Sequence, residues 1–435
     1  MNVVKYKLTK KLSFLLVIVF KIFCDYILVN QLPLAAGDSD IYGLNPNEFK
    51  IILGYLFLVL SLCFVKKIFS RLSLSSITIY FLLFLYYIPI MTIIGQCNLP
   101  YQFFFLVNLY WFNIILFANL FYKNSLHGIA IEKMNFNVNH AFLILLVFSV
   151  ISTYLYNGLN INFDFSDVYD VREESLNVNY FLGLTKNAYV MFLGPIFICF
   201  YLLKKEFLWA LLAIILMLVL FSIGKDKSAL FIILPVIIMS FFKRVNFTAI
   251  KLIVVFFLCL LMVLSYMEYK LYDSHFVCYY IVRRTFFEPS YMNFLYYDFF
   301  SETTKLFFTD HIFLLSRLLP DIHPYGVLEL ISRKYFSGTM GSPNTGLFAE
   351  GYMQLGILGT IIYPIIFVYL LKFIDRITLY YPLLLKTVTA VVIGLAFINL
   401  PITHSHFVVH FGFSSLFMIL INEYYKKERL RVRVS

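Results

Sequence analysis

Charged residues are scarce in this chain. Only 14% of its 435 residues are Asp, Glu, Lys or Arg, whereas 61% are hydrophobic. The mean hydropathy is +0.84, and many apolar runs approach the roughly 20 residues that a helix needs to cross a bilayer. This composition excludes a soluble protein and predicts an all-α polytopic integral membrane protein.

The sequence also lacks paired metal-binding or redox motifs. Its six cysteines include no CxxC pair, so neither a zinc site nor a disulfide framework is indicated. We therefore expect no metal and no cofactor. The basic N-terminus precedes an apolar run, 12–32, that is too long for a signal-peptide core and has no small-residue cleavage site after it. This run is expected to be a retained first helix.

Apolar runs bounded by charged or turn residues predict about twelve spans in one membrane domain, 1–435. The predicted transmembrane helices lie near 12–32, 49–65, 76–95, 101–122, 139–157, 187–203, 207–223, 228–242, 249–267, 346–371, 383–400 and 404–422.

Lys and Arg gather in alternate connections between these spans, which predicts their side of the membrane because basic loops stay in the cytoplasm. Both termini are then cytoplasmic, and the loops 158–186 and 268–345 lie on the outer face of the membrane. The net charge of +11 reflects this topology and attraction to anionic lipid. No basic recognition motif indicates a nucleic-acid partner.

The long loop 268–345 is dense in aromatic and aliphatic residues, unlike a flexible Gly/Ser linker. It predicts four short amphipathic helices at the outer membrane surface. They cover Val277–Phe287, Ser290–Phe300, His311–Leu319 and Tyr325–Phe336, with breaks at Pro289, Pro320 and Pro324. Prolines are expected to interrupt the helices because they lack an N–H donor.

Seven basic and eight acidic residues nearly balance in this loop, so single arginines have to be considered one by one. An arginine fork suits two-point binding of phosphate oxygens. Of the adjacent Arg283 and Arg284, one should face the protein. Arg333 either binds substrate phosphate or forms an exposed ion pair with Glu329, four residues before it.

Two further basic residues stand in outer connections. Arg172 either binds substrate or pairs with its acidic neighbours in the loop 158–186. Lys225, in the turn Gly224–Ser228, either contacts phosphate or extends out of a tight hairpin. By contrast, Lys21 and Asp25 lie one turn apart within the first span and are expected to neutralise each other.

A glycine-rich stretch ends the long loop and leads into the next apolar run. Asn344 and Thr345 can cap the start of that helix, and Glu350 falls about one turn inside it. A carboxylate in an apolar helix is costly unless it is solvated, paired or used. Glu350 is therefore expected either to face a polar cavity or to pair with a structural arginine.

Several short matches, in order along the second half to two-thirds of the chain, resemble the bacterial O-antigen polymerase (Wzy) family and, more distantly, the O-antigen ligases. They are Tyr169-x-x-Arg172, Gly224-Lys225, the aromatic stretch from Arg284 to Glu302, and Asn344-Thr345-Gly346 continuing through Glu350 to Gly356.

This resemblance implies a GT-C-like glycosyltransferase of the bacterial inner membrane with its site on the periplasmic face. Its substrates would be oligosaccharide repeat units on undecaprenyl diphosphate, joined into O-antigen or capsular polysaccharide. A chain-length regulator is the implied partner. Stabilisation of a diphosphate leaving group needs positioned cations and no metal.

The resemblance implies substrate-binding roles for residues in its matched segments and their surroundings. They are Tyr169, Arg172, Lys225, Arg283, Arg284, Arg333, Asn344 and Thr345. The ligases carry a histidine near the start of the helix matched here by 344–356, but this chain has none there. Candidate general bases are therefore Glu350, His311 and His323, with His404 or His406 as further possibilities.

Two other functions are compatible with the sequence. A glycosyltransferase that uses a lipid-monophosphate sugar could employ Asp38 and Asp40 in the first outer loop to bind a cation or act as a base. A lipid-linked oligosaccharide flippase would need charged residues along the centres of several spans.

Overall fold

The computed structural model describes most of the chain as helices, and the described residues contain no strand. The described residues are 2–35, 42–121, 137–157, 180–224, 227–240, 246–309, 322–323, 325–336, 346–403 and 405–434. The all-helical fold agrees with the sequence prediction.

The helices begin and end within a few residues of most predicted apolar runs. The first half contains α1 (Asn2–Asn30), α2 (Leu32–Ala35), α3 (Glu48–Val65), α4 (Leu74–Leu82), η1 (Leu83–Tyr87), α5 (Ile88–Gln96), α6 (Tyr101–Leu120), α7 (Val138–Asn157), α9 (Tyr180–Ala188), η4 (Tyr189–Leu193), α10 (Gly194–Lys204) and α11 (Phe207–Gly224). The second half contains α12 (Lys227–Ser240), α13 (Phe247–Tyr272), η5 (Val277–Phe287), α14 (Glu288–Glu302), α16 (Val327–Phe336), α17 (Leu347–Leu355), η6 (Gly356–Leu358), α18 (Gly359–Ile377), α19 (Leu383–Asn399) and α20 (Ser405–Val434).

Within the described part of the chain, seven helical segments are long and apolar enough to cross a bilayer. They are Glu48–Val65, Leu74–Gln96, Tyr101–Leu120, Gly183–Lys204, Ala249–Tyr272, Leu347–Ile377 and Phe407–Arg431. These segments indicate a membrane-embedded protein with several spans. The total of twelve stays a prediction.

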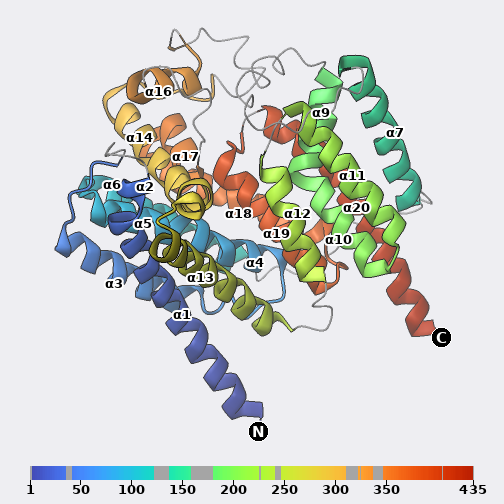
Figure 1. The fold of residues 1–435 in the computed structure, drawn as a ribbon, viewed down its shortest axis with the longest axis horizontal. Coiled ribbons are helices and arrows are strands. Elements are labelled where there is room, and N and C mark those ends of the chain that lie inside the picture. The colour runs from blue at the N-terminus through green and yellow to red at the C-terminus, as the bar shows by residue number, and fades with distance from the viewer. Residues whose placement is uncertain are drawn as a thin grey trace.

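A buried central helix organises the arrangement. Nearly every side chain of α4, η1 and α5 is buried. On one side α1, α3, α6, α14 and α18 surround this helix, and α13 packs along α1. Helix α19 packs against α4 and also against α10, which connects this group to α7, α9, α11, α12 and α20 (Figure 1).

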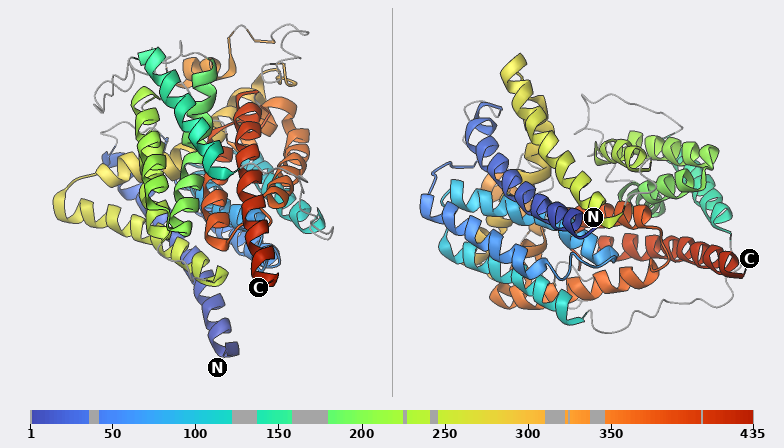
Figure 2. Two further views of the ribbon diagram at one scale, coloured as in Figure 1. Left: turned by 90° about the vertical axis from the view of Figure 1, so that its right-hand side faces the viewer. Right: turned by 90° about the horizontal axis from the view of Figure 1, so that it is seen from below.

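Both chain ends lie at the same end of the molecule. The N-terminus of α1 and the C-terminus of α20 project in one direction, and the view from below shows both facing the viewer (Figure 2). Helices α14 and α16 lie toward the opposite end (Figure 1). We call these the terminal end and the far end.

Three π-helical segments share one sequence feature: a proline follows two residues after each of them. Pro89 follows η1, Pro195 follows η4 and Pro289 follows η5. In each case the residue before the proline donates its N–H to the carbonyl five residues back. The widened turn accommodates a proline ring that would otherwise clash with the carbonyl four residues back.

The predicted helix break at Pro289 is therefore wrong. Residues Val277–Phe287 continue directly into Glu288–Glu302, because η5 absorbs the proline instead of ending at it. Much of α14 is buried, including Asn293 and Tyr296, and it packs against α17. This helix belongs to the packed interior, contrary to the expectation of a surface-lying amphipathic helix.

The predicted span 346–371 lies within the apolar segment Leu347–Ile377, but this segment is not one straight helix. The chain turns at Gly356, whose φ of 59° favours glycine. A Cβ on Gly359 would overlap the carbonyl oxygen of Gly351, although eight residues of straight helix would separate these positions by about 12 Å. Helices α17 and α18 thus form a tight hairpin.

Candidate functional site at the far end

Several predicted site residues lie outside the described part of the chain. They are Tyr169, Arg172, Lys225, His311, Asn344 and Thr345, as well as Asp38, Asp40 and His404, and the side chain of His406. Their predicted roles stay predictions. Arg283, Arg284, His323, Arg333 and Glu350 are described and can be placed.

Arg283 lies in η5 and is held by its own helix. Its Nε donates to the carbonyl of Tyr279 at 3.4 Å, and its guanidinium carbon lies 4.1 Å from the centre of the Tyr279 ring. One terminal nitrogen approaches Glu288 Oε2 at 3.7 Å. Only 12% of its side chain is exposed, so Arg283 is a fixed cation with one loosely held carboxylate.

Arg284, the next residue, is only half-buried but its Nε is shielded from solvent. Among the residues that the structure describes, this nitrogen has no hydrogen-bond partner. Buried donors are usually paired, so an unpaired guanidinium nitrogen marks a place where a ligand can supply the acceptor. The guanidinium fork suits phosphate oxygens.

Glu288 adds a carboxylate that the sequence analysis missed as a candidate. It lies at the start of α14, and its Oε2 has no hydrogen-bond partner within the described residues. Its side chain is 22% exposed, although the unpaired oxygen itself is shielded from solvent. Glu288 can thus accept a proton or a hydroxyl beside the fixed cation of Arg283.

Tyr42, in the segment between α2 and α3, lies near Arg283 and Glu288. Its ring meets the edge of Tyr291 with centroids 4.9 Å apart. Burial, reinforced by the charge of Glu288, raises the pKa of the Tyr42 phenol, so the phenol stays neutral at physiological pH. We call Tyr42, Arg283, Arg284 and Glu288 the arginine site.

Glu350 lies elsewhere, and its surroundings match neither sequence expectation. It is buried in the hairpin, where its two carboxylate oxygens accept from the backbone N–H groups of Ile402 and Thr403, each at 2.6 Å. The Thr403 hydroxyl donates a third bond of 2.6 Å. Glu350 therefore anchors the turn before α20 through both of its oxygens, and no arginine of the described ranges forms an ion pair with it.

Asn293 and Tyr86 hold the start of α17 from the other side. The Tyr86 hydroxyl accepts from Phe348 N at 2.9 Å and donates to Asn293 Oδ1 at 3.3 Å. Asn293 Oδ1 also accepts from Ala349 N at 3.1 Å. We call Tyr86, Asn293, Glu350 and Thr403 the hairpin junction. Sequence reasoning missed Asn293, although a polar residue within an aromatic stretch was a signal.

His323 and Arg333 are tied to local partners. His323 Nε2 lies 3.0 Å from the carbonyl of Thr304, and its ring meets Phe299 and Phe300. Phe299 follows Glu288, the nearest member of the arginine site, by eleven helical residues, so about 16 Å of helix separates the Phe299 contact of His323 from that site. His323 is too far away to take a proton there.

Arg333 donates to Glu329 at 2.6 Å, and the two side chains are 54% and 49% exposed. The alternative of an exposed pair one turn apart is confirmed. Lys21 and Asp25 also pair, at 2.5 Å, and Asp25 accepts from Tyr55 at 2.7 Å. The predicted neutralisation within the first helix is confirmed.

No group of three or more His, Cys, Asp or Glu side chains is placed to hold a metal ion within the described ranges. Comparison of the chain with protein-family models, with curated proteins and with solved structures found no match. The functional assignment therefore depends on the chemistry of the arginine site and on the motif resemblance in the sequence.

Proposed function

We propose that this protein is a membrane glycosyltransferase that polymerises oligosaccharide repeat units carried on undecaprenyl diphosphate, as O-antigen polymerases do. The observation that carries the proposal is the arginine site. There a guanidinium nitrogen of Arg284 and a carboxylate oxygen of Glu288 both lack hydrogen-bond partners among the described residues, and Arg283 lies beside that carboxylate. A diphosphate and a sugar hydroxyl have the complementary groups.

In the proposed reaction, Arg283 and Arg284 bind the diphosphate of the donor. The acceptor sugar hydroxyl attacks the donor's anomeric carbon, and a new glycosidic C–O bond forms. The bond between that carbon and the diphosphate oxygen breaks, and the electron pair leaves with undecaprenyl diphosphate, where the arginines stabilise the charge. Glu288 takes the proton that the hydroxyl loses.

This assignment moves the general base from Glu350 and His323 to Glu288. Glu350 already accepts three hydrogen bonds, and His323 contacts α14 near its C-terminal end, far from Glu288 at its start. His311 stays a second candidate. Arg172, Tyr169 and Lys225 are proposed to assist from the neighbouring outer connections, and Asn344 and Thr345 to line the approach.

The protein is proposed to lie in the bacterial inner membrane with both termini in the cytoplasm and the far end in the periplasm. The common direction of the two termini supports this topology (Figure 2). Glu302 is exposed on α14. A cysteine introduced there should then react with a membrane-impermeant thiol reagent that is added from the periplasmic side. A cysteine at exposed Glu428 should react only after the membrane is opened.

The location of the accumulated intermediate tests the proposal against the flippase alternative. Cells without this protein should display single lipid-linked repeat units on the periplasmic face, because transport would continue while polymerisation stops. Accumulation of these units on the cytoplasmic face would instead show that the protein moves them across the membrane.

A further inference from the structure

We propose that Pro289 keeps Arg284 available for the diphosphate, because this proline holds the helix at the arginine site in a π-helical register. The inference rests on the proposed function for the identity of the ligand. Pro289 itself needs no contact with substrate and is therefore a positioning residue. It acts through the spacing of the charged residues where η5 continues into α14.

The π-helical turn brings Arg283 and Glu288 together. In an α-helix, residues three or four apart are neighbours, whereas residues five apart point to different sides. Arg283 and Glu288 are five residues apart, yet a terminal nitrogen of Arg283 lies 3.7 Å from Glu288 Oε2. The backbone explains this contact, because the N–H of Glu288 donates to the carbonyl of Arg283. A π-helical bond of this kind places the two residues one above the other.

Two pairs elsewhere in the chain show what the α-helical register does with opposite charges. Lys21 and Asp25 in α1 are four residues apart and pair at 2.5 Å. Glu329 and Arg333 in α16 have the same spacing and pair at 2.6 Å. Opposite charges four residues apart are thus neighbours and neutralise each other in these α-helices.

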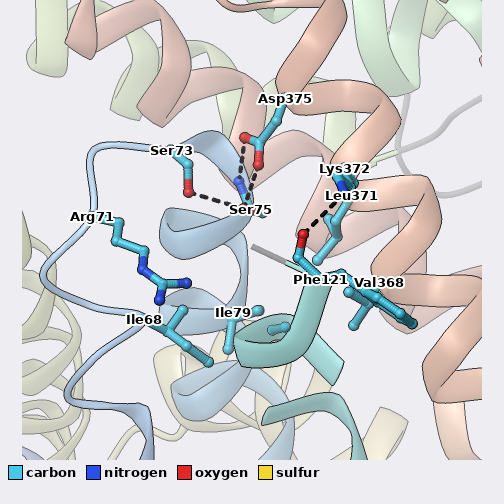
Figure 3. Close-up of a pocket in the computed structure, with 11 residues that line it drawn as sticks. Ile68, Arg71, Ser73, Ser75, Ile79, Phe121, Val368, Leu371, Lys372 and Asp375 are labelled. Carbon is cyan, nitrogen blue, oxygen red and sulfur yellow. Dashed lines mark hydrogen bonds between the residues drawn. The ribbon is translucent and has the colours of Figure 1, made fainter. Parts of the chain in front are cut away.

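Arg284 and Glu288 are also four residues apart, but they stay unpaired. Both residues are described, and Arg284 Nε and Glu288 Oε2 each lack a hydrogen-bond partner within the described structure. The buried Asp375 is different, because the N–H and the hydroxyl of Ser75 bind its two oxygens at 3.0 and 2.5 Å (Figure 3). In an α-helical register Arg284 and Glu288 would be neighbours, and their pairing would occupy the proposed diphosphate ligand.

Pro289 disfavours that α-helical register. A proline has no N–H, and its ring clashes with the carbonyl four residues back, which here belongs to Thr285. An alanine at this position would remove the clash and supply an N–H for the Thr285 carbonyl. The last turn of η5 can then tighten to an α-helical turn, which brings Glu288 toward Arg284.

The π-helix at the arginine site is longer than the other two. η5 has eleven residues, whereas η1 and η4 have five each. Most π-helices are single turns, and they occur frequently at functional sites. η4 packs against α9, α10, α11, α19 and α20, in the other group of helices. Pro195, which follows η4, is therefore a matched control with the same backbone arrangement and no charged pair.

Binding of undecaprenyl diphosphate to the full chain in nanodiscs tests the role of Pro289. Pro289→Ala should weaken binding roughly tenfold, because Arg284 exchanges its charge-assisted bond to the diphosphate for one to Glu288. Pro195→Ala should bind as the unaltered chain does. Thermal unfolding is followed for each protein, and Pro289→Ser, which also supplies an N–H, replaces Pro289→Ala if the latter does not fold. Unchanged binding in the folded variant would overturn the proposal.

The background Glu288→Gln separates positioning from a general loss of structure. Without the carboxylate, Arg284 has no ion-pair partner in either register. Adding Pro289→Ala to Glu288→Gln should therefore weaken binding by less than about twofold. An equal tenfold loss with and without the Glu288 carboxylate would overturn the proposal, because the charge of Glu288 would then play no part.

Modification of Arg284 by phenylglyoxal, located by peptide mass spectrometry, gives a readout that needs no ligand. Arg284 should lose reactivity in Pro289→Ala, whereas Arg333 should react equally in both proteins. If the unaltered chain binds no undecaprenyl diphosphate but Arg284 shows this loss, the proposed function fails and the role of Pro289 in keeping Arg284 unpaired stands. Equal reactivity of Arg284 in the two proteins would overturn that role.

Discussion

The hairpin junction and the arginine site both contain charged or polar groups within an apolar protein, but they differ in how those groups are used. At the hairpin junction, Glu350 receives three hydrogen bonds from residues more than fifty positions away. At the arginine site, Arg284 and Glu288 each keep an atom without a hydrogen-bond partner in the described structure. The first arrangement builds the fold, and the second leaves atoms for a ligand.

This difference shows that a charged residue in a membrane protein is not by itself a functional signal. Glu350 was the most conspicuous carboxylate in the sequence, because it stands in an otherwise small and apolar helix. Its hydrogen bonds to Ile402 and Thr403 show that it holds the turn before α20 in place. Substitutions at the two regions should therefore separate effects on stability from effects on activity.

Gly359→Ala should cause the largest loss of stability. The added Cβ would overlap the Gly351 carbonyl oxygen, and backbone cannot move aside as a flexible side chain would. We expect a cost of about 3 kcal/mol or more, measured by thermal unfolding in detergent. Gly412→Ala is the control, since nothing lies within 4 Å of a Cβ there. Equal unfolding temperatures for both variants would contradict the hairpin.

Arg284→Ala should abolish long polysaccharide while the protein stays folded. Loss of one group that stabilises transition-state charge typically lowers turnover by 100-fold or more, so chains should shrink to single repeats. Arg284→Lys should also impair activity because lysine lacks the fork. Product length is measured on gels, with protein abundance followed by blotting. If the Arg284→Ala variant makes polysaccharide of normal length, Arg284 does not bind the diphosphate.

Glu288→Gln should lower turnover by about 100-fold, because an amide cannot accept the proton. Binding of the donor should persist, so the change should appear in kcat more than in KM. Glu302→Gln is the matched control on the same helix, where the carboxylate is 70% exposed and only loosely paired with Lys334. Similar kinetics for the two variants would exclude Glu288 as the base.

Glu350→Gln should destabilise the hairpin junction by about 2 kcal/mol, because one acceptor oxygen becomes a donor that faces an N–H group. Glu329→Gln, at an exposed position, should shift unfolding by less than about 0.5 kcal/mol. Thermal unfolding in detergent compares them. If Glu350→Gln retains its stability but loses turnover, Glu350 is a catalytic group after all.

Arg333→Ala should have the smallest effect. An exposed ion pair one turn apart contributes about 0.3–0.5 kcal/mol, and Arg333 is bound to Glu329. Polysaccharide length should match that of the unaltered protein. A strong loss of polysaccharide with normal protein stability would instead show that Arg333, on α16, takes part in substrate binding.

Long apolar runs predicted most of the helices, because few other structures bury so many consecutive hydrophobic residues. The breaks were harder to predict. In the sequence, Pro289 predicts the end of a helix, but a π-helical turn accommodates it. Gly356 is predicted to lie within one span, but its positive φ lets the chain reverse there. Both outcomes depend on packing against distant helices.

The candidate site was predictable in part. The sequence indicated Arg283 and Arg284, because two adjacent arginines point to different sides of a helix and one of them should face the protein. It did not indicate Glu288 or Tyr42 as their neighbours, nor the backbone of Ile402 and Thr403 as the partner of Glu350. Such neighbours are set by the tertiary fold, which spacing along the chain does not reveal.

Turnover by the reconstituted protein tests the proposed role of the arginine site. The purified full chain is placed in liposomes with repeat units linked to undecaprenyl diphosphate, and polymer and free undecaprenyl diphosphate are measured together. We predict one undecaprenyl diphosphate released for each linkage formed, with loss of both products in Arg284→Ala and retention in Arg333→Ala. Absence of polymer from the unaltered chain, or equal rates in the two variants, would contradict the proposed function of the arginine site.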